Sequence, residues 1–176
     1  MSFIAIDPGL KGALALFSPE GRAMEVRPMP LIKVGTKAVQ DNLALLALFK
    51  QWKSQTAALE VILEEPLVFH NKKGVYSVGT VLRNVGRIEG ILLSLNIPVH
   101  SVTPKQWQAF YSKTLPLKSL QNWKLDATKQ QSISHATQLF PDISLVPSPR
   151  CRKPSDGIAD ALLIGHFWAE RGYNRG

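Results

Sequence analysis

The segment from Phe3 to Phe17 constrains the fold most, because two short apolar runs flank a polar turn. Short apolar runs bounded by turn residues are typical of buried strands. Pro8 and Gly9 predict a tight turn, and Gly12 leaves room for the close approach of backbone or ligand. We therefore expect a strand, a turn and a second strand near the centre of a sheet.

Asp7 is the one carboxylate in this segment, and it follows directly after the first apolar run. An acid at the end of a buried strand is costly unless it is paired or binds a cation. Alternatively, Asp7 caps the turn by accepting hydrogen bonds from its own backbone. The segment alone does not distinguish these two interpretations.

Strands and helices alternate along the rest of the chain. A third strand is predicted over residues 22–29, and a basic, glycine-containing loop is predicted over residues 33–37. Further strands are predicted at 61–63 and 97–102, and helices at 41–53, 75–96, 103–111, 126–140 and from 156 onward. Three successive strands followed by alternating helices and strands predict an α/β fold with a mixed sheet, in one domain spanning residues 1–176.

The charge balance indicates a polyanionic partner. The chain has 21 basic and 13 acidic residues among 176, which gives a formal net charge of +8. For a small basic domain, nucleic acid is the commonest such partner. The alternative is that the excess of lysine and arginine only keeps the surface soluble.

A reducing compartment is expected from the single cysteine, Cys151, which cannot form an internal disulfide. The first residues lack the pattern of a secretion signal, and the longest apolar runs are far shorter than a membrane span. We therefore expect a cytoplasmic protein without membrane association, and an organellar location remains open.

Four acids form the most informative constellation. Asp7 and Glu64 both lie at the ends of short predicted strands, while Asp156 and Asp160 are four apart on one predicted helix. If the two strands are neighbours, their acids meet at one edge of the sheet. A helix N-terminus by itself also favours an acid such as Asp156. Carboxylates without Cys or His suit Mg²⁺ or Mn²⁺, and such a site in a basic protein suggests two-metal phosphoryl chemistry on nucleic acid.

The motifs that contain these acids, taken in their order along the chain, resemble the signature of RuvC-type Holliday-junction resolvases. Those enzymes belong to the ribonuclease H-like superfamily. The matching stretches are Ile6-Asp7-Pro8-Gly9, Leu63-Glu64-Glu65-Pro66, Lys129 on a helix, and Asp156-Gly157-Ile158-Ala159-Asp160-Ala161-Leu162. The three residues between the last two acids look more like the phage and organellar branch than the bacterial housekeeping enzyme. The resemblance covers nearly the whole chain.

This resemblance implies a ribonuclease H-like fold and a homodimer that binds a four-way DNA junction in recombination and repair. It implies a crossover junction endodeoxyribonuclease that makes paired symmetric nicks with 5′-phosphate and 3′-hydroxyl ends. Asp7, Glu64, Asp156 and Asp160 would hold two Mg²⁺ ions, for which Mn²⁺ is expected to substitute. Lys129 matches the basic residue that the family has near the scissile phosphate. The alternative is that Lys129 is an ordinary solvated helix lysine.

The sequence departs from the family pattern at two places. Glu65 stands where the family more often has Gln, and we take Glu64 as the ligand because it holds the family's position before that Gln. Neighbouring strand residues point to opposite faces, so only one of the two can point into the site. The second basic residue usual after the Thr-Pro turn is also unclear. Gln108 occupies one plausible position, and Lys105 lies nearby.

Candidate DNA contacts lie in loops near strand ends and motif edges. They are Lys11, Phe69, Lys72, Lys73, Lys105, Arg150, Arg152 and Lys153. Phe69 would stack on an unpaired base, or it is a core aromatic. The glycines at 79, 86 and 90 mark a helix face that contacts either a second copy of the chain or the sheet.

Three other functions share some of these features. An actin-like ATPase domain begins with a similar strand-turn-strand, but this chain is short for two lobes and shows no second phosphate loop. A ribonuclease H acting on an RNA–DNA hybrid shares the carboxylates. A non-catalytic DNA-binding relative would have lost acids, whereas all four are present here.

Overall fold

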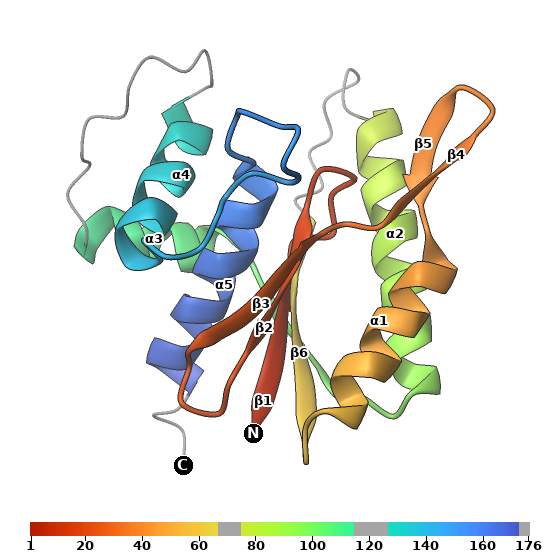
Figure 1. Ribbon diagram of the computed structural model, residues 1–176, viewed down its shortest axis with the longest axis horizontal. Coiled ribbons are helices and arrows are strands. Elements are labelled where there is room, and N and C mark those ends of the chain that lie inside the picture. The colour runs from red at the N-terminus through yellow and green to blue at the C-terminus, as the bar shows by residue number, and fades with distance from the viewer. Residues whose placement is uncertain (67–74, 115–126, 173–176) are drawn as a thin grey trace.

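A five-stranded mixed sheet lies at the centre of the protein (Figure 1). The computed structural model describes residues 1–66, 75–114 and 127–172. The strands follow the spatial order β3-β2-β1-β6-β7, and their bounds are β1 (Ser2–Ile6), β2 (Ala13–Phe17), β3 (Ala23–Pro28), β6 (Leu59–Glu64) and β7 (Val99–Val102). The central strand-turn-strand predicted from the sequence is confirmed by β1 and β2.

The register of β1 and β6 decides where the acids emerge. β1 pairs antiparallel with β2 and parallel with β6, and Ile6 lies opposite Leu63. Asp7 and Glu64, which follow these two residues, therefore leave the sheet at the same carboxyl edge.

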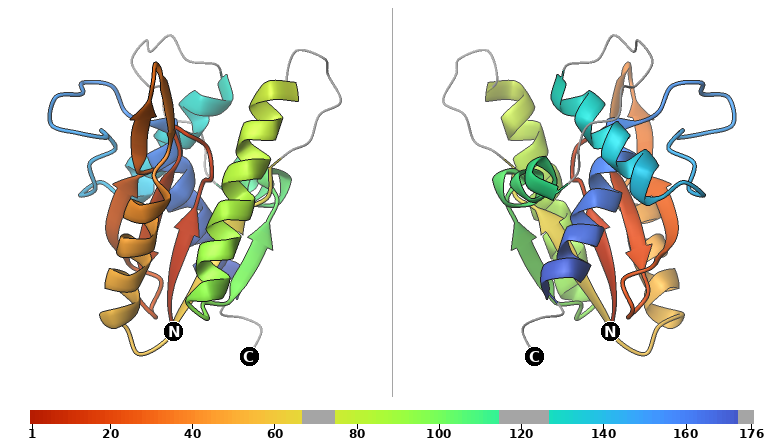
Figure 2. Two further views of the ribbon diagram at one scale, coloured as in Figure 1. Left: turned by 90° about the vertical axis from the view of Figure 1, so that its right-hand side faces the viewer. Right: turned by 90° about the vertical axis from the view of Figure 1, so that its left-hand side faces the viewer.

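Helices cover both faces of the sheet (Figures 1 and 2). On one face lie α1 (Asn42–Ser54) and α2 (Val75–Ser94), and on the other lie α3 (Pro104–Thr114), α4 (Ala127–Leu139) and α5 (Asp156–Gly172). The side chains of β1 alternate between these layers: Phe3 and Ala5 pack in the core with α5, and Ile4 and Ile6 pack with α1 and α2. This arrangement confirms the predicted α/β fold. None of the helices in the described ranges is long and apolar enough to span a membrane.

Side-chain caps set the starts of two helices at the predicted positions. The Asp41 carboxylate accepts from the backbone N–H groups of Leu43 and Ala44 at 3.1 and 3.0 Å. Thr103 Oγ1 accepts from the N–H of Gln106 at 3.3 Å, and Gln106 Oε1 accepts from the N–H of Thr103 at 2.8 Å. These bonds satisfy donors that the first turn leaves without helical partners.

The predicted basic loop over residues 33–37 is wrong. The segment forms a two-stranded hairpin of β4 (Leu31–Val34) and β5 (Lys37–Gln40). Gly35 adopts a φ of 60°, which a tight hairpin turn requires and which glycine adopts without strain. The β-branched residues on either side of this turn favour strand pairing. The lysines and the glycine had suggested a loop instead.

Gly157 allows α5 to approach the turn after β1 closely, and Gly12 allows that turn to fold back on Asp7. A Cβ atom on Gly157 would lie 2.1 Å from the carbonyl oxygen of Lys11, and one on Gly12 would lie 2.1 Å from that of Asp7. Neither position admits a side chain without moving the backbone. The first turn of α5, which carries Asp156, is therefore held directly beside Asp7.

We predict that Gly157→Ala destabilises the protein by roughly 1–3 kcal/mol, because the added methyl group forces α5 away from the turn. Denaturant unfolding of the metal-free protein measures this loss. Glu170→Ala, on the exposed surface of the same helix, serves as the control and is expected to change stability little. Equal stability of the two variants would show that the close approach is not needed.

Candidate active site

The four acids lie together at the carboxyl edge of the sheet. Asp7 follows β1, Glu64 ends β6, and Asp156 and Asp160 lie in the first two turns of α5. The charge of Asp7 acts on both Glu64 and Asp160, and the charge of Asp156 acts on Asp7 and Asp160. The predicted meeting of strand acids and helix acids is therefore present in the structure.

Burial makes this cluster electrostatically costly. It raises the pKa of Asp7 to about 6, that of Asp160 to about 7 and that of Glu64 to about 8. Repulsion contributes to the same shifts, from Asp156 in the case of Asp7 and from Asp7 in the other two cases. Three carboxylates with raised pKa values in one place are typical of a functional site.

The backbone holds Asp7, whose Oδ1 accepts from the N–H of Gly9 at 2.9 Å. The capping interpretation of Asp7 is therefore confirmed, and the same side chain also faces the other acids. Lys129 on α4 forms an ion pair with Asp156, with Nζ 2.7 Å from Oδ2. Its charge also lowers the pKa of Asp7 and Asp160, so the lysine singled out from the sequence lies within the acidic cluster.

Two neutral donors contact the remaining acids. Trp107 Nε1 donates to Glu64 Oε1 at 2.8 Å, and Ser132 hydrogen-bonds to the carboxylate of Asp160. One oxygen of that group, Asp160 Oδ1, is buried and has no hydrogen-bond partner among the described residues. A buried carboxylate oxygen without a donor is costly, and a cation would satisfy it.

The donor set fits a hard divalent cation. All four groups are carboxylates, the ligands that suit Mg²⁺ and Mn²⁺, and Asp160 Oδ1 has an open coordination position. In the described ranges, no group of three or more His, Cys, Asp or Glu side chains is already arranged to hold a metal ion. Lys129 occupies one oxygen of Asp156, so cation binding requires rearrangement of side chains within the cluster.

Glu64 and Glu65 lie in different environments. Glu64 is partly buried and faces Asp7 and Asp160, whereas Glu65 is exposed. The backbone N–H of Glu65 continues the sheet by donating to the carbonyl of Val102 at 2.9 Å. The geometry therefore favours Glu64 as the member of the cluster.

The predicted DNA contacts fall into two groups. Five are exposed in the structure, namely Lys11, Lys105, Arg150, Arg152 and Lys153. Phe69, Lys72 and Lys73 lie outside the described residues. Lys11 and Lys153 line a groove of about 330 Å³ together with Asp156, so positive charge borders the acidic cluster.

Sequence reasoning overlooked three residues that shape the site: Gly157, Trp107 and Ser132. The adjacency of Gly157 to Asp156 was the only local signal for close packing at the start of α5. Trp107 and Ser132 gave no signal, because each meets its acid through contacts between distant segments. Gln108, a candidate for the second basic position, is exposed and lines a small cavity between α3 and α4.

We predict that Asp160→Asn stabilises the metal-free protein in EDTA. The folded-state pKa of Asp160, about 7, lies above its ordinary value of 3.8, so the wild-type protein loses stability as the pH rises between these values. The free energy of unfolding of the variant should therefore exceed that of the wild type by an amount that grows from about pH 4 to pH 7. Above about pH 7, this difference should be roughly 1–3 kcal/mol. Thermal unfolding as a function of pH measures it.

Asp142→Asn is the matched control, because Asp142 is exposed and remote from the cluster. We expect no comparable pH-dependent gain in that variant. A constant difference between Asp160→Asn and the wild type across this pH range would contradict the electrostatic explanation.

Two solved structures of RuvC from Thermus thermophilus resemble the chain. The first, RuvC in complex with a Holliday junction substrate, has a TM-score of 0.53 at 16% identity, over 98% of this chain and 96% of that chain. The second, a RuvC structure, has a TM-score of 0.52 at 19% identity, over 98% and 97%. No protein-family model and no curated protein matches the sequence. These likenesses show that the chain has the ribonuclease H-like fold of RuvC, as the motifs predicted.

Proposed function

We propose that this protein is a metal-dependent endonuclease that resolves four-way DNA junctions by paired symmetric nicks. The observation that carries the proposal is the buried cluster of Asp7, Glu64, Asp156 and Asp160 at the carboxyl edge of the sheet, with Lys129 beside it. One of the two RuvC structures that share this fold holds a Holliday junction substrate, which supports branched DNA as the target.

The four acids would hold two Mg²⁺ ions, or Mn²⁺ in their place. When bound, such a pair of ions activates a water molecule and stabilises the leaving 3′ oxygen, which gives 5′-phosphate and 3′-hydroxyl ends. Gly9 and Trp107 keep the carboxylates of Asp7 and Glu64 oriented. On binding DNA, the Lys129 ammonium would leave Asp156 and contact a phosphate oxygen next to the scissile bond.

Positive charge around the cluster supports a nucleic-acid substrate. Lys11 and Lys153 line the groove beside Asp156, and Arg150 and Arg152 are exposed in the loop that precedes α5. In Figure 1 this loop lies at the end of the sheet where β1 and β6 terminate. These cations would bind phosphates and bring the backbone to the acids.

An exposed stripe on α2 supports a homodimer. Gly79, Leu82, Gly86, Gly90 and Leu93 recur at three- and four-residue spacing and are all exposed. A Cβ atom on any of these glycines would meet no atom within 4 Å in the described part of the chain. The stripe therefore does not pack against the sheet, which favours the dimer contact among the two possibilities that the sequence left open. Leu93 is 78% exposed and would be covered in such a contact.

We predict that the protein cuts a labelled four-way junction in Mg²⁺ but not in EDTA. Linear duplex of the same sequences and an RNA–DNA hybrid serve as parallel substrates. Symmetric nicks on the junction alone support the proposal. Cleavage of the hybrid would instead support a ribonuclease H activity from the same acids. If the protein cleaves none of the three substrates, it would instead be a DNA-binding protein without nuclease activity.

The variants Asp7→Asn, Glu64→Gln and Asp160→Asn should each lose cleavage and keep junction binding, because they remove ligands and no predicted phosphate contacts. Single-turnover cleavage and gel-shift assays on the same preparations separate these properties. Cleavage retained in any one variant would remove that residue from the site.

We predict that junction affinity falls steeply with salt, and that the paired change Arg152→Ala with Lys153→Ala weakens binding and reduces this dependence. Each lost phosphate contact should lower the slope of log K against log salt by about 0.9. Arg22→Ala with Lys50→Ala removes the same charge from exposed positions outside the loop that precedes α5. Identical salt slopes for the two paired variants would argue against this loop as the DNA surface.

A further inference from the structure

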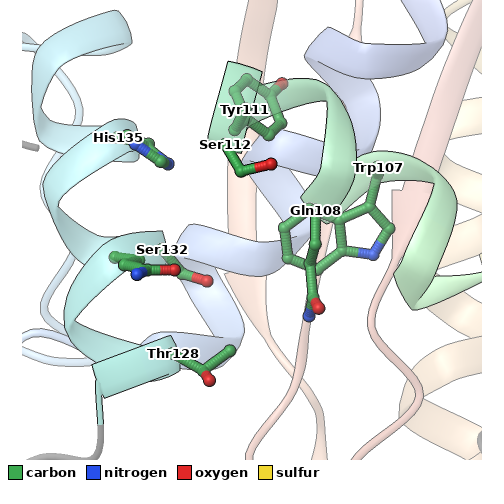
Figure 3. A pocket seen from close by; sticks show the side chains of 8 residues that line it. Trp107, Gln108, Tyr111, Ser112, Thr128, Ser132 and His135 are labelled. Atoms are coloured by element: carbon green, nitrogen blue, oxygen red, sulfur yellow. The ribbon is translucent and has the colours of Figure 1, made fainter. Parts of the chain in front are cut away.

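Trp107 forms a wall between the acidic cluster and the small cavity that separates α3 from α4. It is only 2% exposed, and Gln108, Ser132 and His135 also line the cavity. In Figure 3 its indole nitrogen lies on the side of the ring away from α4. The single polar atom of the side chain thus points out of the cavity, and it meets Glu64.

The hydrogen bond to Glu64 fixes one of two carboxylate oxygens. The indole has one hydrogen-bond donor and no acceptor. Its Nε1–H donates to Oε1 at 2.8 Å, so the indole makes no hydrogen bond to Oε2. Within the described ranges, Glu64 makes no ion pair and accepts no other side-chain hydrogen bond. The orientation of this carboxylate therefore depends on Trp107.

Two other tryptophans donate to glutamates, which allows a direct comparison. Trp52 Nε1 donates to Glu25 Oε2 at 2.8 Å, and Glu25 also pairs with Arg27. Trp168 Nε1 donates to Glu60 Oε1 at 3.3 Å, and Glu60 also contacts His100. Arg27 therefore balances the charge of Glu25, and His100 gives Glu60 a second side-chain partner.

Glu64 differs because its charged neighbours are acids. Asp7 and Asp160 repel it, and its only side-chain partner in the described part of the chain is a neutral donor. A lysine or arginine in place of Trp107 would neutralise Glu64 and compete with a metal ion. An apolar residue would leave the buried oxygen without a donor and the carboxylate free to rotate.

We propose that Trp107 is a positioning residue for metal binding: its N–H holds one oxygen of Glu64 so that the carboxyl group stays directed at Asp7 and Asp160. The inference rests on the proposed metal-dependent function. Under this proposal, Trp107 in the first turns of α3 contributes to metal affinity as well as to packing. Mutation of the outer hydrogen-bond partner of a metal ligand typically lowers metal affinity by roughly 10- to 100-fold.

The test is Mn²⁺ binding to the metal-stripped full chain by titration calorimetry. Trp107→Phe keeps the aromatic ring and loses the donor, and we expect it to bind Mn²⁺ about 10-fold or more weakly than the wild type. Trp52→Phe is the matched control, because it breaks an equally short bond to a glutamate outside the acidic cluster. That variant should keep wild-type Mn²⁺ affinity even if its stability falls.

Cleavage measured against Mn²⁺ concentration gives a second readout. Trp107→Phe should need more Mn²⁺ for half-maximal cleavage and recover most of its activity at saturation, which loss of folding would not produce.

A third readout needs no variant protein. In wild-type protein, the indole N–H resonance of Trp107 should shift on addition of Mg²⁺, while those of Trp52 and Trp168 stay in place.

The outcomes separate the two proposals. Equal Mn²⁺ affinity for Trp107→Phe and the wild type, or a Trp107 resonance that ignores Mg²⁺, would overturn the role of Trp107 and leave the nuclease intact. A wild-type protein that binds no Mn²⁺ would overturn both. Weaker binding in Trp52→Phe to the same extent would show a general effect of stability and would also overturn the role.

Discussion

The burial of several carboxylates in one place is the constraint on which the site depends. Burial raises the pKa of Asp7, Glu64 and Asp160, and repulsion from a neighbouring acid contributes to each of these shifts. Such a cluster persists only if the surrounding structure fixes it strongly. Here the apolar cores on both faces of the sheet supply that support, because they determine where β1, β6 and α5 end or begin.

The partners of the acids do not neutralise the cluster fully. Within the described residues, one lysine pairs with Asp156, Asp7 and Glu64 receive only neutral N–H donors, and Asp160 keeps one buried oxygen without a partner. These contacts orient the carboxylates and leave negative charge uncompensated. That balance is expected of the proposed cation site and differs from a structural ion-pair network, in which the charges would cancel. The protein thus sacrifices some stability at this edge, as functional sites commonly do.

The sequence was sufficient to locate the acids, because each stands at a boundary that local patterns mark. Apolar runs predicted β1 and β6, and the spacing of Asp156 and Asp160 predicted a shared helix face. The supporting contacts could not be predicted in this way. Trp107 is 43 residues from Glu64 in the chain, and the need for Gly157 appears only when α5 meets the turn at Lys11. The β4–β5 hairpin was missed because its lysines and glycine were given more weight than its β-branched residues.

The fold alone does not identify the substrate, since one fold supports many activities. The acids lie at the ends of regular elements, so the proposed chemistry would be set by the sheet and would be the same for any phosphodiester. Under the proposed function, the choice among substrates would depend on features outside this edge, namely the cations of the loop before α5 and the exposed stripe on α2. A junction differs from a duplex or a hybrid in presenting two equivalent scissile strands at a fixed separation. Two cooperating sites could match that separation only if a dimer contact fixed the distance between them. In the proposed dimer, the α2 stripe would therefore bear on substrate choice as directly as the cations do.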